Sequence, residues 1–263
     1  MFTGFNVKLP EYEVVTPQTH LSFTVRTLTV SEEEHMKASL VTPIKVTEHL
    51  NRCIWNSIVS KPENITDYNS FLKSVTMKDR EALLYGLYHI TYGEVRNYFV
   101  ICSQSECKNK YPVTVSVSST FNFNPYPDKD ILTKTCRVEL PVTKGVYVSV
   151  KQPTLFDEIT SMRDLSSGEF NSDMVSSTLV VQSFEQDSSL SKNPVSYTDR
   201  KDIIEAYRSL PAKDRKVIHS TYYEQFGQYG MSLKMKSVCP KCSSTEVVDI
   251  ELVEQFFRMV FSV

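Results

Sequence analysis

The stretch SVCPKCSSTEVVDIEL, Ser237 to Leu252, decides the fold that we expect for this chain. It places Cys239 and Cys242 two residues apart, with a proline between them, and follows the pair with alternating polar and apolar residues. Such alternation predicts a half-buried β-strand, so the cysteine pair falls in the turn of a β-hairpin. Because a redox pair normally opens a helix instead, the pattern favours a metal knuckle.

A second stretch of the chain has the same order of features. KDREALLYGLYHITYGEVRNYFVICSQSEC and KDRKVIHSTYYEQFGQYGMSLKMKSVCPKC each begin with Lys-Asp-Arg, continue to a Tyr-Gly pair and end with two cysteines. Alternating runs follow both, YPVTVSVS after the first and STEVVDIEL after the second. The sequence therefore predicts an internal repeat of helix, strand, cysteine knuckle and strand.

The repeat supplies the number of ligands that a tetrahedral zinc ion needs. Two packed hairpins would join Cys102, Cys107, Cys239 and Cys242 in one site, which four thiolates fill without leaving a position for water. We therefore predict a structural zinc ion. Two alternatives stay open: a thiol redox pair, which requires a cysteine of low pKa, and reduced cysteines in hairpin turns that bind no metal. Cys53 and Cys136 are interpreted as small buried side chains.

Composition limits the classes of function. The chain has 263 residues, 41% of them hydrophobic, and a net charge of -2, as expected of a folded domain with no overall attraction to nucleic acid or anionic lipid. We find neither a signal-peptide pattern nor a run of about 18 apolar residues, and expect a cytosolic protein without a membrane span. Phosphate-loop, HExxH and GxSxG motifs are missing from the sequence, which predicts no enzymatic activity.

Local patterns predict the elements. LSFTVRTL alternates as a strand, and Ser31 with Glu34 predicts a capping box at a helix start. Apolar spacing predicts a helix over residues 46–59, and Thr76 and Gly93 bracket another. TLFDEITSMRDL and DMVSSTLVVQSF predict two more helices.

We expect one α+β domain over residues 1–263, built from helices and short antiparallel hairpins. Its predicted parts are N-terminal strands in 1–30, a first helix and knuckle half in 31–150, an acidic, serine-rich helical insert in 151–197, and a second helix and knuckle half with an apolar tail in 198–263.

Charge is unevenly distributed along the chain. Residues Gln152 to Ser191 carry a net charge of -6, and residues Arg208 to Lys241 carry +5, which predicts docking or self-association through charge. The aromatic residues of the basic stretch suggest a nucleic-acid surface. However, Ile218, Tyr222 and Phe226 recur at helical spacing, which favours a core face and makes nucleic-acid binding the weaker interpretation.

The end of the chain is rich in large apolar side chains. The segment VEQFFRMVFSV contains Phe256, Phe257, Met259 and Phe261, which a soluble monomer would have to bury. We weigh two interpretations: a last core strand, or a docking element whose aromatic residues bind a partner subunit.

Several of these pieces, taken in order, resemble a known family. FTVRTLTVSEEEHM, FVICSQSECKNKYPVTVSVS and SLPAKDRKVIHSTYYEQFGQYGMSLKMKSVCPKCSSTEVVDIEL are similar to T-even-type bacteriophage baseplate hub and hub-assembly proteins. The resemblance spans nearly the whole chain. It implies a structural or assembly role in the baseplate hub of a contractile-tailed phage, through contacts with other tail and hub proteins. Such a late protein would act in the host cytoplasm during assembly or in the virion tail baseplate. A zinc-ribbon nucleic-acid-binding regulator is the alternative.

Overall fold

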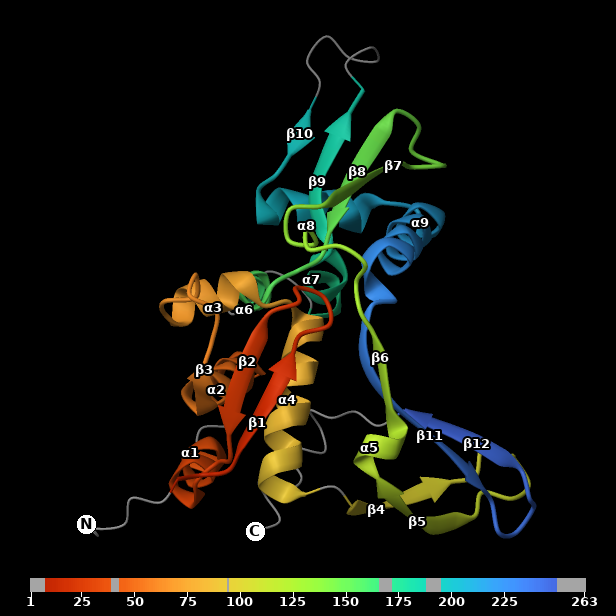
Figure 1. The fold of residues 1–263 in the computed structure, drawn as a ribbon. Coiled ribbons are helices and arrows are strands. Elements are labelled where there is room, and N and C mark those ends of the chain that lie inside the picture. Colours follow the sequence, from red (N-terminus) through yellow and green to blue (C-terminus); the bar gives the residue numbers. More distant parts are fainter. Residues whose placement is uncertain (1–7, 39–42, 94, 166–171, 188–194, 250–263) are drawn as a thin grey trace.

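The computed structural model describes residues 8–38, 43–93, 95–165, 172–187 and 195–249, and it has the α+β fold that the sequence predicts. Figure 1 shows two lobes, each with a small antiparallel sheet and helices, and a strand module to one side of the lower lobe. The apolar tail Phe256, Phe257, Met259 and Phe261 lies outside the described residues.

The first lobe packs helices on a sheet with the strand order β1-β2-β3. Phe23 and Val25 point from the middle strand into the core, where each is at most 1% exposed. Helix α4 can approach this sheet closely because residue 86 is glycine: a Cβ there would lie 2.3 Å from Val14 Cγ2. The elements of this lobe are β1 (Glu11–Val15), β2 (Ser22–Arg26), α1 (Val30–Ala38), α2 (Pro43–Ser57), β3 (Ile58–Ser60), α3 (Tyr68–Ser74) and α4 (Met77–Tyr92).

The second lobe has its own sheet, in the order β10-β9-β8-β7, and a separate core around Val148, Phe184 and Ile218. Helix α6 differs from the other elements of this lobe in its packing, because its Leu155 and Ile159 belong to the core of the first lobe. The elements of this lobe are β7 (Thr135–Glu139), β8 (Val146–Lys151), α6 (Leu155–Leu165), α7 (Ser172–Thr178), β9 (Val181–Gln186), β10 (Ser196–Tyr197), α8 (Arg200–Ser209), α9 (Ala212–Tyr222) and the π-helical turn η1 (Tyr223–Gly227).

The strand module joins segments from both parts of the chain. It contains the hairpin β4-β5 and a second sheet in the order β12-β11-β6. Its inward side chains, among them Tyr111 and Met235, continue the core of the first lobe. The elements of the strand module are β4 (Val95–Ile101), β5 (Lys110–Ser116), α5 (Val117–Thr120), β6 (Phe121–Asn124), β11 (Gly230–Val238) and β12 (Thr245–Asp249).

The two lobes follow the same order of elements. In each, a hairpin is followed by two helices, a strand beside the hairpin, two more helices and then a strand that leads to a cysteine pair. The order runs from β1 to β5 in the first lobe and, with β10 added, from β7 to β12 in the second. Residues 151–197 contribute α6, α7 and β9 to this order, in the places that α1, α2 and β3 hold in the first lobe.

A buried aspartate ties each central helix to its hairpin. Asp79, the third residue of α4, accepts bonds from the Gln18 N–H at 2.8 Å and the Thr19 hydroxyl at 2.7 Å. Asp214, the third residue of α9, accepts bonds from the Val142 N–H at 2.8 Å and the Thr143 hydroxyl at 2.7 Å. Both aspartates are 0% exposed. Each therefore fixes the Pro-x-Thr turn of a hairpin far away in sequence.

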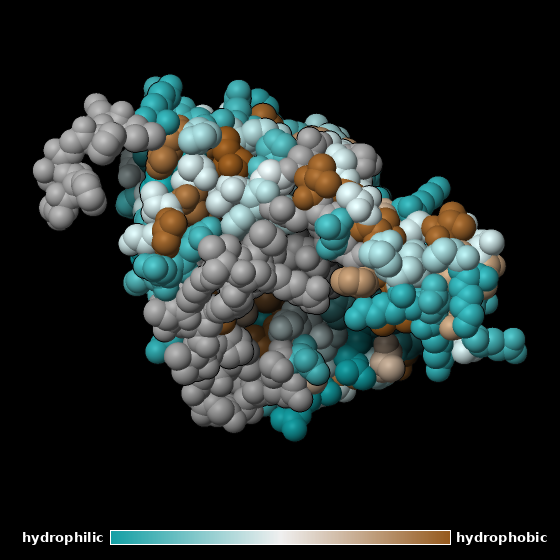
Figure 2. All heavy atoms as spheres, turned by 90° about the horizontal axis from the view of Figure 1, so that it is seen from below, coloured by the Kyte–Doolittle hydropathy of each residue, from teal (hydrophilic) through white to brown (hydrophobic). Residues whose placement is uncertain are grey.

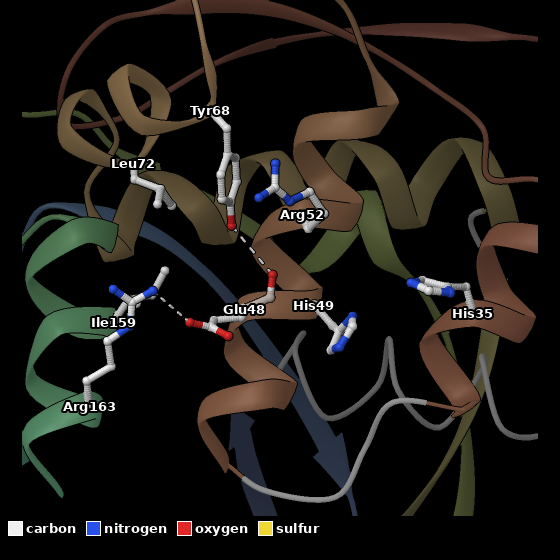
Figure 3. Close-up of a pocket in the computed structure, with 8 residues that line it drawn as sticks. All are labelled: His35, Glu48, His49, Arg52, Tyr68, Leu72, Ile159 and Arg163. Atoms are coloured by element: carbon white, nitrogen blue, oxygen red, sulfur yellow. Dashed lines mark hydrogen bonds and ion pairs between the residues drawn. The ribbon is translucent and has the colours of Figure 1, made fainter. Parts of the chain in front are cut away.

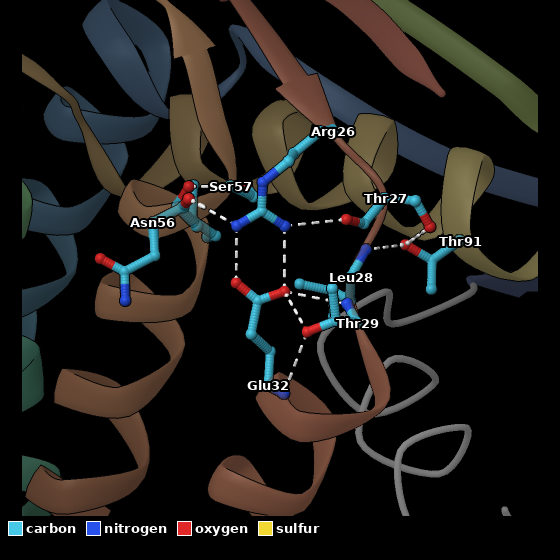
Figure 4. A network of polar contacts seen from close by, with 9 residues as sticks. Arg26, Thr27, Leu28, Thr29, Glu32, Asn56, Ser57 and Thr91 are labelled. Atoms are coloured by element: carbon cyan, nitrogen blue, oxygen red, sulfur yellow. Dashed lines mark hydrogen bonds and ion pairs between the residues drawn. The ribbon is translucent and has the colours of Figure 1, made fainter. Parts of the chain in front are cut away.

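The two lobes also share an ion-paired motif at the connection from a strand to the next helix, shown for the first lobe in Figure 4. Arg26, the last residue of β2, pairs with Glu32 at 2.7 Å, while Glu32 accepts a bond from the Thr29 N–H at 2.9 Å. Lys151, the last residue of β8, pairs with Asp157 at 3.0 Å, and Asp157 accepts from the Thr154 N–H at 2.9 Å. The spacing of cation, threonine and acid is the same in both lobes.

These contacts correct two details of the sequence prediction. Helix α1 begins at Val30 and not after Ser31, because Thr29 and Glu32 form the reciprocal bonds expected of a capping box. Only the first part of DMVSSTLVVQSF is helical. Its second part is strand β9, because two neighbouring strands offer its backbone hydrogen-bond partners that the sequence pattern does not reveal.

The lobes meet at a buried glutamine. Gln18 donates from its side chain to the backbone oxygens of Phe226 at 3.1 Å and Tyr229 at 3.0 Å, and its own oxygen accepts from the Thr76 hydroxyl at 2.7 Å. Since Gln18 is 0% exposed, these bonds fix the first hairpin turn against the end of the α9 segment.

Candidate metal centre

The two cysteine hairpins have the same local geometry. In each, the first cysteine follows a strand: its N–H bonds across the hairpin, from Cys102 to the Asn109 oxygen and from Cys239 to the Ser244 oxygen, both at 2.9 Å. The residue directly after the second cysteine has a positive φ, 41° for Lys108 and 61° for Ser243. The extra residues between Cys102 and Cys107 therefore widen the turn without changing how it closes.

The hairpins bring all four predicted ligands together. The Sγ atoms of Cys102, Cys107, Cys239 and Cys242 all lie within 4.8 Å of one another. Two pairs cross between hairpins, Cys102 to Cys242 at 3.5 Å and Cys107 to Cys239 at 3.8 Å. All four are free thiols. A tetrahedral zinc ion with bonds of about 2.3 Å separates its sulfur ligands by about 3.8 Å, so the arrangement fits this ion.

Polar side chains around the cluster extend the site beyond the predicted cysteines. The Ser244 hydroxyl lies 3.2 Å from the sulfurs of both Cys102 and Cys242, and the Asn109 amide points at the Cys239 sulfur at 3.8 Å. Hydrogen bonds from the side chain and backbone of Ser244 lower the pKa of Cys242 to about 6. The surroundings of Cys242 therefore favour the thiolate, which is the form that binds metals, whereas burial and the neighbouring thiols raise the pKa of Cys102 and Cys107.

Glu246 is the residue that the sequence analysis missed. Its carboxylate accepts bonds from the Ser103 N–H and hydroxyl, both at 3.1 Å, and lies 3.5 Å from the Cys102 sulfur. It thereby holds the turn of one hairpin to a strand of the other, and the Ser103 N–H is the largest cause of its lowered pKa. The alternation of β12 places Glu246 on the buried face, which is the signal that could have identified it.

A polar cleft of about 430 Å³ is an alternative site (Figure 3). Its charged side chains contact other residues that line the cleft: Arg163 pairs with Glu48 at 3.1 Å, and the Arg52 guanidinium lies 3.5 Å above the Tyr68 ring. None of its described lining residues is a serine, threonine or cysteine that could act as a nucleophile. The cleft is lined by His35, Glu48, His49, Arg52, Tyr68, Leu72, Ile159 and Arg163.

The aromatic residues of the basic stretch differ in burial: Phe226 is in the core, Tyr222 and Tyr229 pack partly buried against it, and Tyr223 is 62% exposed. Ile218 and Phe226 are 0% exposed, and Tyr222 is half-buried and donates to Gln152 at 3.1 Å. The prediction that this apolar stripe packs inward is confirmed, so these side chains do not form a stacking surface for bases. Among the described residues, no helix is both long and apolar enough to cross a bilayer.

Comparison with known families adds the identity that geometry alone does not give. The sequence model of the family described as T4 bacteriophage base plate protein matches residues 9–258, nearly the whole chain. The chain belongs to this family. Its role is therefore that of a phage baseplate protein, and membership implies contact with other baseplate proteins of the phage. No curated protein and no solved structure matches the chain.

Proposed function

We propose that this baseplate protein is a hub component or a hub-assembly factor of a contractile-tailed phage and that it acts through protein contacts. The observation that carries the proposal is the family match over residues 9–258. The pieces that resemble hub and hub-assembly proteins direct it to the hub. The protein would assemble in the host cytoplasm and act there or in the finished tail baseplate.

We further propose that Cys102, Cys107, Cys239 and Cys242 bind one structural zinc ion. The sulfur spacing supports this assignment, and four thiolates would complete the coordination of zinc. The ion would join β4-β5 to β11-β12, whose cysteine pairs lie more than 130 residues apart. Its role would be to hold the strand module together, because a closed four-thiolate site leaves no position for a substrate.

The C-terminal residues Phe256, Phe257, Met259 and Phe261 are proposed as contacts to a partner subunit. Aromatic side chains commonly supply much of the binding energy of protein interfaces. Deletion of residues 256–263 tests this role: the shortened protein should keep its metal and its melting temperature but lose its partner. A shortened protein that unfolds would assign these side chains to the core instead.

Purification of tagged protein from infected cells tests the function as a whole. We expect hub and tail proteins in the eluate, identified by mass spectrometry, and a tag on the Cys239→Ser variant should recover fewer of them. Recovery of nucleic acid without tail proteins, lost steeply as salt rises, would instead support the zinc-ribbon regulator. Analysis of purified virions by the same method decides whether the protein stays in the mature tail.

A further inference from the structure

The β4-β5 hairpin has an outer face that no other described element covers. Phe99 is 67% and Ile101 64% exposed, while the next residue of the opposite face, Val100, is 4% exposed. In the view from below, Figure 2 shows apolar spheres among hydrophilic ones on the part of the molecule that projects to the side. Large apolar side chains that share one strand face indicate an interaction site more strongly than scattered ones, because they can contact the same partner protein.

The same residues also direct their backbone groups away from β5. The Cys102 N–H donates to the Asn109 oxygen at 2.9 Å, which makes this a hydrogen-bonded pair of the antiparallel ladder. Such pairs alternate, so Val100, opposite Tyr111, also bonds to β5. Asn97, Phe99 and Ile101 therefore point their N–H and C=O groups to the other edge. Within the described residues, β4 pairs with β5 alone.

The second cysteine hairpin shows what such an edge can bind. Strand β11 corresponds to β4, since both follow a Tyr-Gly pair and end before a cysteine. However, β11 has neighbours on both edges, along successive parts of its length: β12 pairs with Lys234–Val238, and β6 pairs with Gly230–Leu233, where Phe121 and Phe123 lie opposite Leu233 and Met231. Strand β6 is the short segment Phe-Asn-Phe-Asn, with apolar residues at alternate positions. The described chain supplies no such strand to β4.

We propose that the edge and outer face of β4 bind an extended segment of another baseplate subunit, which adds as a strand. The segment should resemble β6, with large apolar residues at alternate positions. It should also carry an acidic residue near the end of β4, because Lys110 lies opposite Ile101 and its ammonium is 5.0 Å from the Phe99 ring centre. Main-chain hydrogen bonds supply affinity in this mode, and the alternate side chains supply specificity.

Photo-crosslinking in infected cells tests the proposal, which rests on the proposed function. Benzoylphenylalanine replaces Phe99 in one tagged protein and Val247 in the control. Val247 is 61% exposed on the outer face of the other hairpin. We expect an adduct at least about tenfold stronger from position 99, joined to an alternating apolar segment of a baseplate subunit that mass spectrometry identifies. Equal adducts from both positions, an adduct with a second copy of this chain, or an adduct to a helical segment would overturn the proposal.

Two variants separate strand addition from simple apolar contact. Asn97→Pro removes an outward N–H, and with it the side-chain bond from Thr114, but keeps the apolar face and the backbone bonds to β5, so the adduct from position 99 should fall about tenfold. Ile101→Lys keeps the backbone and should also weaken the adduct; it remains informative if the proline variant fails to fold. An unchanged adduct in folded Asn97→Pro protein refutes strand addition. If tagged protein without benzoylphenylalanine recovers no baseplate proteins from infected cells, the proposed function fails. If it recovers them but position 99 forms no adduct, only this inference fails.

Discussion

The lobes around α4 and α9 anchor their central helices in the same way but in different surroundings. Asp79 also accepts a bond from the backbone N–H of Thr76, its own helix cap, whereas the cap of α9 is Pro211, which has no N–H to donate. Burial raises the pKa of Asp79 despite its hydrogen bonds. Burial also acts on Asp214, but bonds from Thr143 and Val142 outweigh it and lower the pKa. A shared motif can therefore have opposite electrostatic consequences.

The largest effect is expected from the two cysteine hairpins, which should contribute equally to metal binding and to stability. If one zinc ion joins them, Cys102→Ser and Cys239→Ser should each lose the metal and destabilise the protein by more than about 4 kcal/mol, because structural zinc binds with roughly 10 to 16 kcal/mol. Metal analysis and thermal unfolding measure both effects. Cys136→Ser, outside the cluster, should keep the metal and nearly the parental melting temperature. A variant of Cys239 that stays metal-loaded, or parental protein that contains no zinc, would refute the shared site.

Replacement of the arginine in the Lys-Asp-Arg motif should destabilise the protein more in the first lobe than in the second. Arg80 pairs with Glu158, and their side chains are 11% and 6% exposed. Arg80→Ala leaves a buried carboxylate without its partner, which should cost about 3 to 5 kcal/mol in urea unfolding. Arg215→Ala, at the matching position of α9, should cost about 1 kcal/mol because no described carboxylate pairs with it. The double variant Arg80→Met, Glu158→Leu should recover most of the loss; if it does not, packing and not charge explains the cost.

The two buried aspartates should respond to pH in opposite directions. Each Asp→Asn variant should lose about 1 to 3 kcal/mol at neutral pH, since backbone donors of the hairpin turn would face an amide. The folded-state pKa of Asp214 is lowered, so its contribution is present above pH about 4 and is lost as pH falls through the folded pKa. The cost of Asp214→Asn should therefore shrink in acid.

The raised pKa of Asp79 has the opposite sign: protonation favours the folded state, and the cost of Asp79→Asn should grow as pH falls toward about 4. Urea titrations of both variants and the parent between pH 7 and 3 measure the two slopes. Parallel slopes for the two variants would show that the surroundings of the lobes do not differ electrostatically.

The smallest expected loss of stability concerns the ion-paired motif between strand and helix. The hydrogen bond from Arg26 lowers the pKa of Glu32 to about 2, but the pair is partly exposed and solvent screening limits its contribution to about 0.5 to 1 kcal/mol. Glu32→Gln should lose this amount at pH 7. The loss should disappear as pH falls from about 4.5 to 2, because the lowered pKa stabilises the fold only while the carboxylate is ionised. Asp157→Asn in the second lobe should have a similar effect at pH 7. A much larger effect would show that the two ion-paired motifs do not contribute equally to stability.

The sequence predicted those features whose cause is local. Thr76 begins α4 as expected, where it forms a capping box with Asp79, and Gly93 ends the helix with a φ of 78° that favours glycine. The strands on either side of each cysteine pair follow from their alternation, and the clustering of four cysteines follows from the repeated pattern. The division into halves and an insert remains a prediction.

The tertiary structure decided what depends on segments far apart in the chain. Whether Asp79 is a surface cap or a buried anchor depends on a turn 60 residues away, which the helix pattern does not contain. Strand β9 forms because β8 and β10 lie beside it, and Glu246 joins the cysteine cluster because the two hairpins pack together. Sequence periodicity records which side of an element is buried, but it does not record its partner. Hydrogen-bond partners, and therefore the pKa values of the buried acids, are fixed only when the chain has packed.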